Sequence, residues 1–271
     1  MIYKESDWHI LLDGKKILIA GYGREGRSSQ TFLSKLLPTA NIDVADGNSN
    51  IQSAAPHYDL ILKSPGIPMS VFADVCPLHK VSSQSDLFLQ VYHNQTIGIT
   101  GTKGKSTTTE LINHMLVNGL PLSPRQSDQQ FTNVIKAGNM GIPLFDIIPQ
   151  MSESTLVVAE LSCHQLENIH CAPHISVLLN LFQEHLDHYP SYRRYKMAKL
   201  NIALKQYKND HCFYCADNPD LTDLISELRK QITSQISPYT ATLEPTTIPY
   251  SPSLQGLHNR SNAIVAKMVA Q

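Results

Sequence analysis

The sequence predicts an α/β fold made of two successive units, each built on a parallel sheet. Short apolar runs typical of buried strands alternate with helical patterns along most of the 271 residues, and this alternation predicts the class. A glycine-rich turn follows a strand twice, at Gly21–Gly26 and at Gly101–Gly104, and this repetition predicts the division into two units.

The first unit is expected to be Rossmann-like. It begins with the strand Lys16–Ala20, the turn Gly21–Gly26 and a helix that Pro38 ends. Ile42–Ala45 is the next expected strand, and Asp46 follows it about 20 residues after the turn, where an acidic residue can bind a ribose. This spacing favours a site for a diphosphate-linked nucleotide, and the alternative is a tight turn needed only for packing.

A third strand, Asp59–Leu62, is followed by Ser64, Pro65 and Gly66 at its carboxyl end. Ligands of open α/β sheets collect at that end, although an ordinary Pro-Gly turn is an equal alternative. A helix is expected over Ser82–Tyr92, and the polar residues around His93–Gln95 mark a boundary. The predicted domains are therefore residues 1–94 and residues 95–271.

The second unit is expected to be a P-loop α/β domain of the ATPase type, organised around Ile99–Thr109. A strand ends at Thr100, glycines allow a tight turn, Lys105 adds a positive charge, and Ser106 opens a helix and offers a hydroxyl for magnesium. Ile99 stands where the longer P-loop pattern has its first glycine, so the loop fits a shorter variant, G-T-x-G-K-[ST]. The alternative is a glycine-rich turn beside a surface lysine.

Further candidate groups follow along this unit. A glycine turn, Ala137–Pro143, carries the amide of Asn139. The apolar strand Thr155–Glu160 ends in a carboxylate that resembles the magnesium-side acid of nucleotide-hydrolysing folds, unless Glu160 only caps the strand. The segment Ser162–Gln165 then opens a helix.

The later part of the chain gives weaker signals. His185 and His188 could share a helix face and bind a metal, although solvated histidines are the commoner outcome. The helix Tyr192–Leu204 has a basic face that is solvated by default, and spacing alone does not single out Lys199. Cys212–Cys215 has the C-x-x-C spacing without a second pair, so it is expected to be core.

Four more segments complete the pattern. Residues 119–130 are expected to be loop, His174–Asn180 to be a strand, residues 231–253 to be irregular strands or loop, and Ala263–Val269 to be a last helix. The net charge of −1 gives no reason to expect a nucleic acid or an anionic membrane as partner, and no apolar run is long enough to span a membrane. Five scattered cysteines favour reduced thiols and a cytoplasmic protein.

Taken together, these motifs resemble the Mur ligase family, and they occur in the family's order along nearly the whole chain. The resembling segments are Gly21–Gly26, Ser64–Ile67, Gly101–Thr107, Gly138–Gly141, Glu160–Glu167, His185–Asp187, Lys199, Gly256–Asn259 and Asn262. The segment 160–167 is similar to that of the D-glutamate-adding member. The resemblance implies a monomeric ligase that uses ATP and two Mg²⁺ ions to join D-glutamate to UDP-N-acetylmuramoyl-L-alanine through an acyl phosphate.

The resemblance also implies roles for individual residues. The UDP-linked precursor would contact Gly21, Tyr22, Gly23, Arg24, Asp46, Ser64, Pro65 and Gly66, with Asn139, Ser162 and Gln165 on its muramoyl part. ATP would contact Gly101, Thr102, Lys103, Gly104, Lys105, Ser106, Thr107 and Asn259. Magnesium would be bound by Ser106, Glu160, His185 and a carbamylated Lys199, and catalysis is assigned to Lys105, Glu160, His185 and Lys199.

Three departures from the family pattern are visible. Cys163 and His164 replace the more usual Ser-Phe, and Glu184 stands where an Asp usually precedes the histidine. No residues correspond to the family's amino-acid-binding third domain, and the central domain is expected to lack its last elements. We therefore expect precursor and ATP binding with little amide synthesis. The alternatives are a non-catalytic precursor-binding module, another Mur ligase specificity, or a nicotinamide-dependent oxidoreductase suggested only by Gly21–Gly26.

Overall fold

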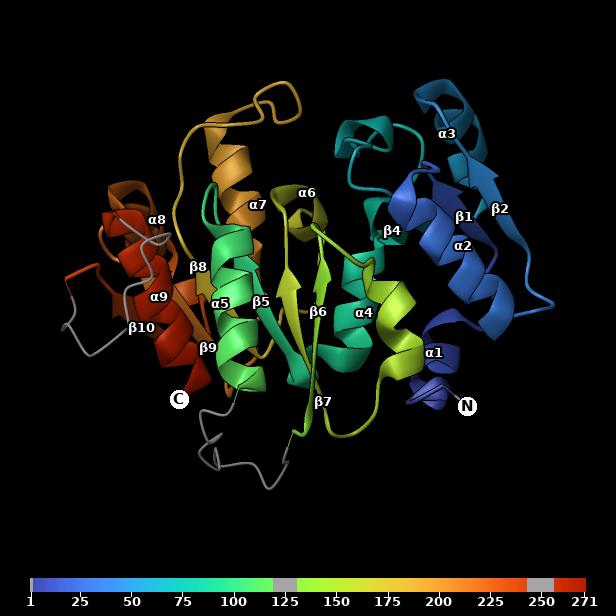
Figure 1. The fold of residues 1–271 in the computed structure, drawn as a ribbon. Coiled ribbons are helices and arrows are strands. Elements are labelled where there is room, and N and C mark those ends of the chain that lie inside the picture. Colours follow the sequence, from blue (N-terminus) through green and yellow to red (C-terminus); the bar gives the residue numbers. More distant parts are fainter. Residues whose placement is uncertain (1, 119–130, 243–255) are drawn as a thin grey trace.

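The computed structural model describes residues 2–118, 131–242 and 256–271 (Figure 1). It contains a four-stranded and a six-stranded sheet, and every strand pairing within them is parallel. The predicted α/β class is therefore confirmed. In the part of the chain that is described, no helix combines the length and the apolar character needed to cross a membrane.

The first sheet has the strand order β2-β1-β3-β4 and lies at the N-terminal side of the molecule (Figure 1). Its strands are β1 (Ile17–Ala20), β2 (Ile42–Ala45), β3 (Leu60–Lys63) and β4 (Val81–Ser82). Its helices are α1 (Glu5–Leu12), α2 (Arg24–Leu36), α3 (Asn48–Ala54) and α4 (Gln84–Tyr92). Strand β1 is central and buried throughout, since it pairs with both β2 and β3.

The second sheet has the order β10-β9-β8-β5-β7-β6. Its strands are β5 (Thr96–Thr100), β6 (Asn133–Gly138), β7 (Thr155–Glu160), β8 (Ile175–Leu178), β9 (His211–Cys215) and β10 (Gln235–Tyr239). Its helices are α5 (Lys105–Val117), α6 (Cys163–Leu166), α7 (Tyr192–Leu204), α8 (Pro219–Leu228) and α9 (Leu257–Ala270), with a 3-10 helix η5 (Leu144–Gln150). The strand order changes direction at β5, so the loop after β5 opens at the point where ligands of such sheets bind.

Both faces of this sheet are covered, as in other parallel sheets. Side chains of β7 alternate, with Val158 in the core beneath α5 and α9 and Val157 in the core on the opposite face. In Figure 1, α5 and α9 lie side by side on one face of the sheet. Covered faces explain why the strands read as continuous apolar runs in the sequence.

One apolar core joins the two sheets. Trp8 of α1 makes edge contacts with Phe32 of α2 and with Phe145 of η5, at ring-centroid distances of 4.9 and 5.3 Å. The same cluster includes Ile19 of β1 and Val157 of β7, which belong to different sheets. The predicted boundary after residue 94 lies in the short turn before β5, and it stays a prediction because the core is continuous across it.

Several element bounds differ from the predicted ones for local reasons. The predicted helix Ser82–Tyr92 begins at Gln84, because Val81–Ser82 pairs with β3 and the Ser83 hydroxyl caps the helix by accepting from the Asp86 amide. The last helix begins at Leu257, six residues before Ala263. The predicted strand His174–Asn180 is shorter, the region expected to be irregular contains β10, and the loop predicted over 119–130 lies outside the described residues.

Candidate functional site at the carboxyl ends of both sheets

The glycine loop after β5 is held in place by Asn180, which follows β8. The Asn180 side-chain oxygen accepts from the Lys103 amide at 2.8 Å, and its backbone oxygen accepts from the Thr102 amide at 2.9 Å. Helix α5 begins at Lys105, so its free N–H groups and positive dipole end face the loop. The strand, turn and helix predicted for this segment are therefore present in that order.

The Lys105 ammonium donates to the backbone oxygens of Gly101 and Thr102, at 3.1 and 3.0 Å. Next to it, the Ser106 hydroxyl donates to a Glu160 carboxylate oxygen at 2.7 Å. The loop can therefore offer backbone amides, an ammonium and a hydroxyl to a phosphate chain at one place.

Glu160 lies at the end of β7, beside Ile99 of the central strand, and is only 2% exposed. Besides Ser106, its carboxylate accepts from the Asn139 side-chain amide at 2.9 Å. Asn139 follows β6, the neighbouring strand. Adjacent strands thus bring together three groups that are distant in the sequence, and their oxygen atoms suit a magnesium ion.

Lys199 is buried, which corrects the default expectation of a solvated cation. Its side chain is 2% exposed, and its ammonium donates to the Gly101 oxygen at 2.9 Å and lies over the Tyr195 ring. Arg193 and Arg194 of the same helix are exposed, because the face of α7 that carries Lys199 packs against the sheet and the face that carries the arginines does not. Burial lowers the pKa of Lys199 to about 8, and the nearby Lys105 adds to the shift.

Replacing Lys199 with methionine is therefore expected to raise the free energy of unfolding by about 1–3 kcal/mol near pH 7. A fall in the pKa of Lys199 from 10.5 to about 8 means that the protonated side chain destabilises the folded state by about 3 kcal/mol. Methionine removes this cost but also loses the hydrogen bond to Gly101, which offsets about 1 kcal/mol. Since the unfolded chain binds more protons between pH 8 and 10.5, the unaltered protein gains stability with rising pH across that window.

Urea unfolding between about pH 7 and 10 would measure the difference. Lys196→Met is the matched control on the same helix, because Lys196 is only half-buried and pairs with Asp220 at 3.0 Å. That variant should be slightly less stable than the unaltered chain. A Lys199→Met protein less stable than Lys196→Met would contradict the burial argument.

The structure places His185 and His188 in an irregular segment, so the expected helix face does not exist. His185 has a left-handed backbone with φ of 57°, and its carbonyl accepts from the His188 amide in a turn. His185 is exposed, as expected for a solvated histidine, and lies beside Cys163 and His164. The His188 side chain is only 11% exposed and its Nε2 lies 3.6 Å from a Glu167 oxygen, so the solvated alternative is wrong for it.

His164 lies beside this pair, and burial lowers its pKa to about 3, with a further contribution from the positive charges that His188 and His185 can carry. Its ring is stacked on Tyr189 and lies 4.1 Å from the His188 ring centroid. Imidazole groups are thus concentrated on one side of the site.

In the first sheet, the turn after β1 and the segment after β3 lie together. The Ser64 hydroxyl donates to the Gly21 oxygen at 2.8 Å, and a Cβ added to Gly26 would lie 2.2 Å from the same oxygen. Packing therefore requires glycine at position 26 whether or not a ligand binds. Asp46 is exposed and follows Ala45, whose oxygen accepts from the Gly21 amide, so it lies at the same edge.

Two hydrogen bonds connect this turn to the second sheet. Arg24 donates to the Asn139 backbone oxygen at 2.7 Å, and Gln165 donates to the Glu25 carboxylate at 2.7 Å. Ser162 caps α6 and, with Gln165, forms a capping box that fixes this amide. A continuous series of contacts therefore runs from the first-sheet turn through Asn139 and Glu160 to the glycine loop.

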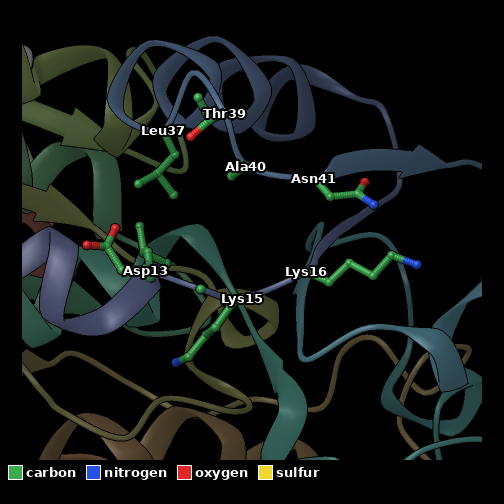
Figure 2. Close-up of a pocket in the computed structure, with 9 residues that line it drawn as sticks. Asp13, Lys15, Lys16, Leu37, Thr39, Ala40 and Asn41 are labelled. Atoms are coloured by element: carbon green, nitrogen blue, oxygen red, sulfur yellow. The ribbon is translucent and has the colours of Figure 1, made fainter.

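A pocket of about 590 Å³ opens beside the glycine loop. The residues lining it include Lys103, Gly104, Asn180, His258, Ser261 and Asn262. Asn259 is not among them, although it lies in the same turn of α9. A second pocket, of about 330 Å³, lies at the amino end of β1 between Asp13–Lys16 and Leu37–Asn41, away from these groups (Figure 2).

Comparison with known proteins decides the family. Residues 99–270 match the family model described as "Mur ligase middle domain". The chain belongs to the Mur ligase family. Its matched segment contains the glycine loop, Glu160, Lys199 and the residues around the larger pocket.

Curated relatives agree with this. The chain is 32% identical to a protein named UDP-N-acetylmuramoylalanine–D-glutamate ligase from Lacticaseibacillus casei (strain BL23), over 93% of this chain and 61% of the relative. It is 29% identical to the protein of that name from Bacillus cereus (strain G9842), over 80% of this chain and 51% of the relative. The chain thus spans between half and two thirds of the length of these two relatives.

Two solved structures share the fold of this Mur ligase chain. A UDP-N-acetylmuramoyl-L-alanyl-D-glutamate–2,6-diaminopimelate ligase superposes with a TM-score of 0.53 at 18% identity, over 94% of this chain and 56% of the other. A UDP-N-acetylmuramate:L-alanyl-gamma-D-glutamyl-meso-diaminopimelate ligase from Neisseria meningitides gives 0.52 at 17%, over 94% and 93%. At these sequence identities, the comparison with the two structures shows a shared fold and nothing further.

Asn180 and Tyr195 are two residues that hold the glycine loop and that motif reasoning did not single out. Tyr195 shares a hydrogen bond of 2.8 Å with the Thr102 hydroxyl and lies under Lys199. Asn180 could have been found by asking which residue ends the strand beside β5. The Cys212–Cys215 pair is buried in β9, which confirms its expected place in the core.

Proposed function

We propose that this chain carries the precursor-binding and ATP-binding machinery of a ligase that adds D-glutamate to UDP-N-acetylmuramoyl-L-alanine in the cytoplasm. The observation that carries the proposal is the series of contacts from Arg24 through Asn139 and Glu160 to Ser106. It connects a nucleotide-type turn in one sheet to a triphosphate-type loop in the other. The names of the curated relatives support the choice of precursor and amino acid.

The chemistry joins a carboxylate to an amine. An oxygen of the precursor's carboxylate attacks the γ-phosphorus of ATP, the bond to ADP breaks, and an acyl phosphate forms. The amine nitrogen of D-glutamate then attacks the acyl carbon, phosphate leaves, and the amine loses a proton. Positioning and charge neutralisation supply most of the catalysis in phosphoryl transfer.

In this scheme the turn Gly21–Gly26, with Tyr22, Gly23 and Arg24, and the segment Ser64–Gly66 hold the UDP end. Asn139, Ser162 and Gln165 hold the muramoyl part, because they lie between that turn and the glycine loop. Asp46 lies at the same sheet edge and would bind the ribose. In this scheme the precursor's carboxylate would lie toward Glu160.

Gly101–Thr107 would hold the phosphates of ATP. The Lys105 ammonium has loop carbonyls as partners and can exchange them for phosphate oxygens. The adenine end would lie in the pocket lined by His258 and Asn262, with Asn259 near it on α9.

Magnesium would neutralise the phosphate charge when bound. Ser106 and Glu160 provide oxygen donors 2.7 Å apart that fit one ion. A second ion would be bound by His185 and by Lys199 as a carbamate, since carbamylation replaces the buried ammonium with an oxygen anion. Glu160, Lys105, His185 and Lys199 are the groups we assign to catalysis.

Calorimetry tests the proposal directly. The chain should bind UDP-N-acetylmuramoyl-L-alanine and, in the presence of Mg²⁺, ATP, and binding of the precursor should weaken in Arg24→Ala. Lys35→Ala is the matched control, because it removes an exposed cation from the last turn of the same helix, away from the turn Gly21–Gly26. Precursor binding without ATP affinity would instead support a non-catalytic binding module, and NAD binding would support an oxidoreductase. Phosphate release on adding D-glutamate measures any amide synthesis.

Lys199 should become carbamylated when the protein is exposed to carbon dioxide. The neutral amine nitrogen attacks the carbon and a proton is released, so the reaction requires the deprotonated form. With a pKa of about 8, roughly a tenth of the amine is neutral near pH 7, far more than for an ordinary lysine. A carbamate signal in the ¹³C NMR spectrum of protein in labelled bicarbonate should grow as pH rises through 8.

Lys199→Met should lack this signal and Lys63→Met should retain it. Lys63 is the matched control because it is also 2% exposed and burial lowers its pKa, but its ammonium lies 3.6 Å from Glu167. A carbamate that survives in Lys199→Met would show that another amine reacts.

A further inference from the structure

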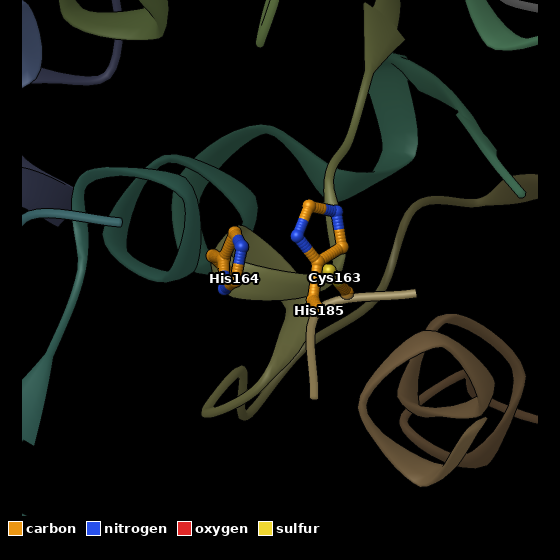
Figure 3. Close-up of side chains that lie close together, drawn as sticks. All are labelled: Cys163, His164 and His185. Atoms are coloured by element: carbon orange, nitrogen blue, oxygen red, sulfur yellow. The ribbon is translucent and has the colours of Figure 1, made fainter. Parts of the chain in front are cut away.

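We propose that Cys163, His164 and His185 form a binding site for zinc or a similar transition-metal ion. One ligand atom from each side chain lies within 4.8 Å of the other two. Figure 3 shows the two imidazole rings next to each other with the Cys163 sulfur beside them, and the ring planes are inclined by 70° with the centroids 5.0 Å apart. This inference concerns a separate ion from magnesium and does not depend on ligase activity.

The chemistry of the donors favours zinc over magnesium. A thiolate and two imidazole nitrogens are soft or borderline ligands, which Zn²⁺ binds in a tetrahedron, whereas Mg²⁺ prefers a ligand set made mostly of oxygen atoms. Ligand atoms at typical zinc distances, about 2.3 Å for sulfur and about 2.0–2.1 Å for nitrogen, lie about 3.3–3.7 Å from one another. Ligand pairs in the cluster, which are within 4.8 Å, therefore have to close by about 1.5 Å at most.

The local structure allows this closure. Cys163 and His164 open α6, whose capping box at Ser162 holds both backbones in place. His185 lies in an irregular segment and its side chain is 45% exposed, so it can turn toward the other two. Cys163 is 2% exposed, and an ion would therefore enter from the His185 side and become shielded from water.

A fourth ligand is close by. The His188 ring centroid lies 4.1 Å from that of His164, and His188 Nε2 is a buried nitrogen without a hydrogen-bond partner in the described part of the chain. A Glu167 carboxylate oxygen lies 3.6 Å from His188, and a Glu184 oxygen lies 3.9 Å from His185. These carboxylates offset the positive charge of Lys63 and Lys199, which are close to His164. The surroundings can therefore accommodate a divalent cation bound to a thiolate.

The site has a consequence for the reaction, and this part alone rests on the proposed function. His185 is also the imidazole assigned to magnesium, so zinc bound with Cys163 and His164 would compete for it. Zinc should then act as an inhibitor that is bound beside the reaction centre.

Cobalt substitution tests the site with the full 271-residue chain. Titration with Co²⁺ should produce a thiolate-to-metal charge-transfer band in the near ultraviolet at one ion per chain, and added Zn²⁺ should displace it. Cys163→Ser should abolish the band. In His164→Phe the zinc affinity should fall by more than about 100-fold, since loss of an outer-shell partner alone typically costs 10–100-fold.

Two variants serve as matched controls. Cys171→Ser removes another buried thiol, and His57→Phe removes an exposed imidazole in the first unit, so both should keep the band and the affinity. Circular dichroism checks that each variant folds, and the wild-type spectrum is informative without any variant. A titration without the charge-transfer band, or one with a band that persists in Cys163→Ser, would overturn the proposal.

Discussion

Lys105→Ala is expected to weaken the binding of ATP with Mg²⁺ by about 100-fold or more. The ammonium is one of two positive side chains in the loop, with Lys103, and its present partners are two backbone oxygens, which phosphate oxygens can replace. Hydrogen bonds to charged groups are worth about 1.5–3 kcal/mol each, and two such bonds account for the expected loss. Isothermal titration with a non-hydrolysable ATP analogue measures it.

Lys208→Ala is the control, because this exposed lysine lies between α7 and β9, away from the loop. Its affinity should equal that of the unaltered chain. Lys105→Arg should not restore binding, since a guanidinium has a different shape and reach from an ammonium. If Lys105→Ala binds ATP within twofold of the unaltered chain, the glycine loop does not hold the phosphates.

Gly138→Ala is expected to lower the free energy of unfolding by about 2–6 kcal/mol. A Cβ at this position would lie 2.2 Å from the Glu160 backbone oxygen, and the backbone has a φ of 111° that residues with side chains rarely adopt. Overpacking of this kind costs about 1–3 kcal/mol and the backbone strain about 1–3 kcal/mol more. Urea unfolding at neutral pH would measure the sum.

Gly141→Ala separates the two contributions. Its φ is 106°, yet a Cβ there has no neighbour within 4 Å among the described residues, so only the strain remains. We expect a loss of about 1–3 kcal/mol. Equal losses in the two variants would mean that contact with Glu160 is not what requires glycine at position 138. Gly138→Ala should also weaken ATP binding, since it displaces the strand end that carries Glu160.

Local patterns predicted most of the fold. Helix α7 has the predicted bounds Tyr192–Leu204, because the Ser191 hydroxyl caps its start and an apolar face continues to its end. The strand–turn–helix order around Gly21–Gly26 and Gly101–Gly104 is likewise present. Each of these features depends on residues within a few positions of one another, which periodicity and capping rules can capture.

Features that depend on distant contacts were not predictable in this way. Burial of Lys199 follows from which face α7 turns to Gly101, about a hundred residues away in the sequence. The spacing of His185 and His188 suggested a helix, but the left-handed backbone at His185 excludes one. The residue-by-residue roles drawn from the family resemblance stay predictions, although the structure brings Ser106, Glu160 and Asn139 into contact.

The aromatic contacts around Trp8 have a mechanical implication for ligand binding. Opening the molecule between its sheets would expose Trp8, Phe32 and Phe145 to water, which costs about 25 cal/mol for each Å² of apolar surface. Hinge bending at this junction is therefore opposed by the hydrophobic effect. The surface that binds the precursor should therefore be preorganised. The heat-capacity change on binding should be set by the area that the precursor itself buries, with little contribution from domain closure.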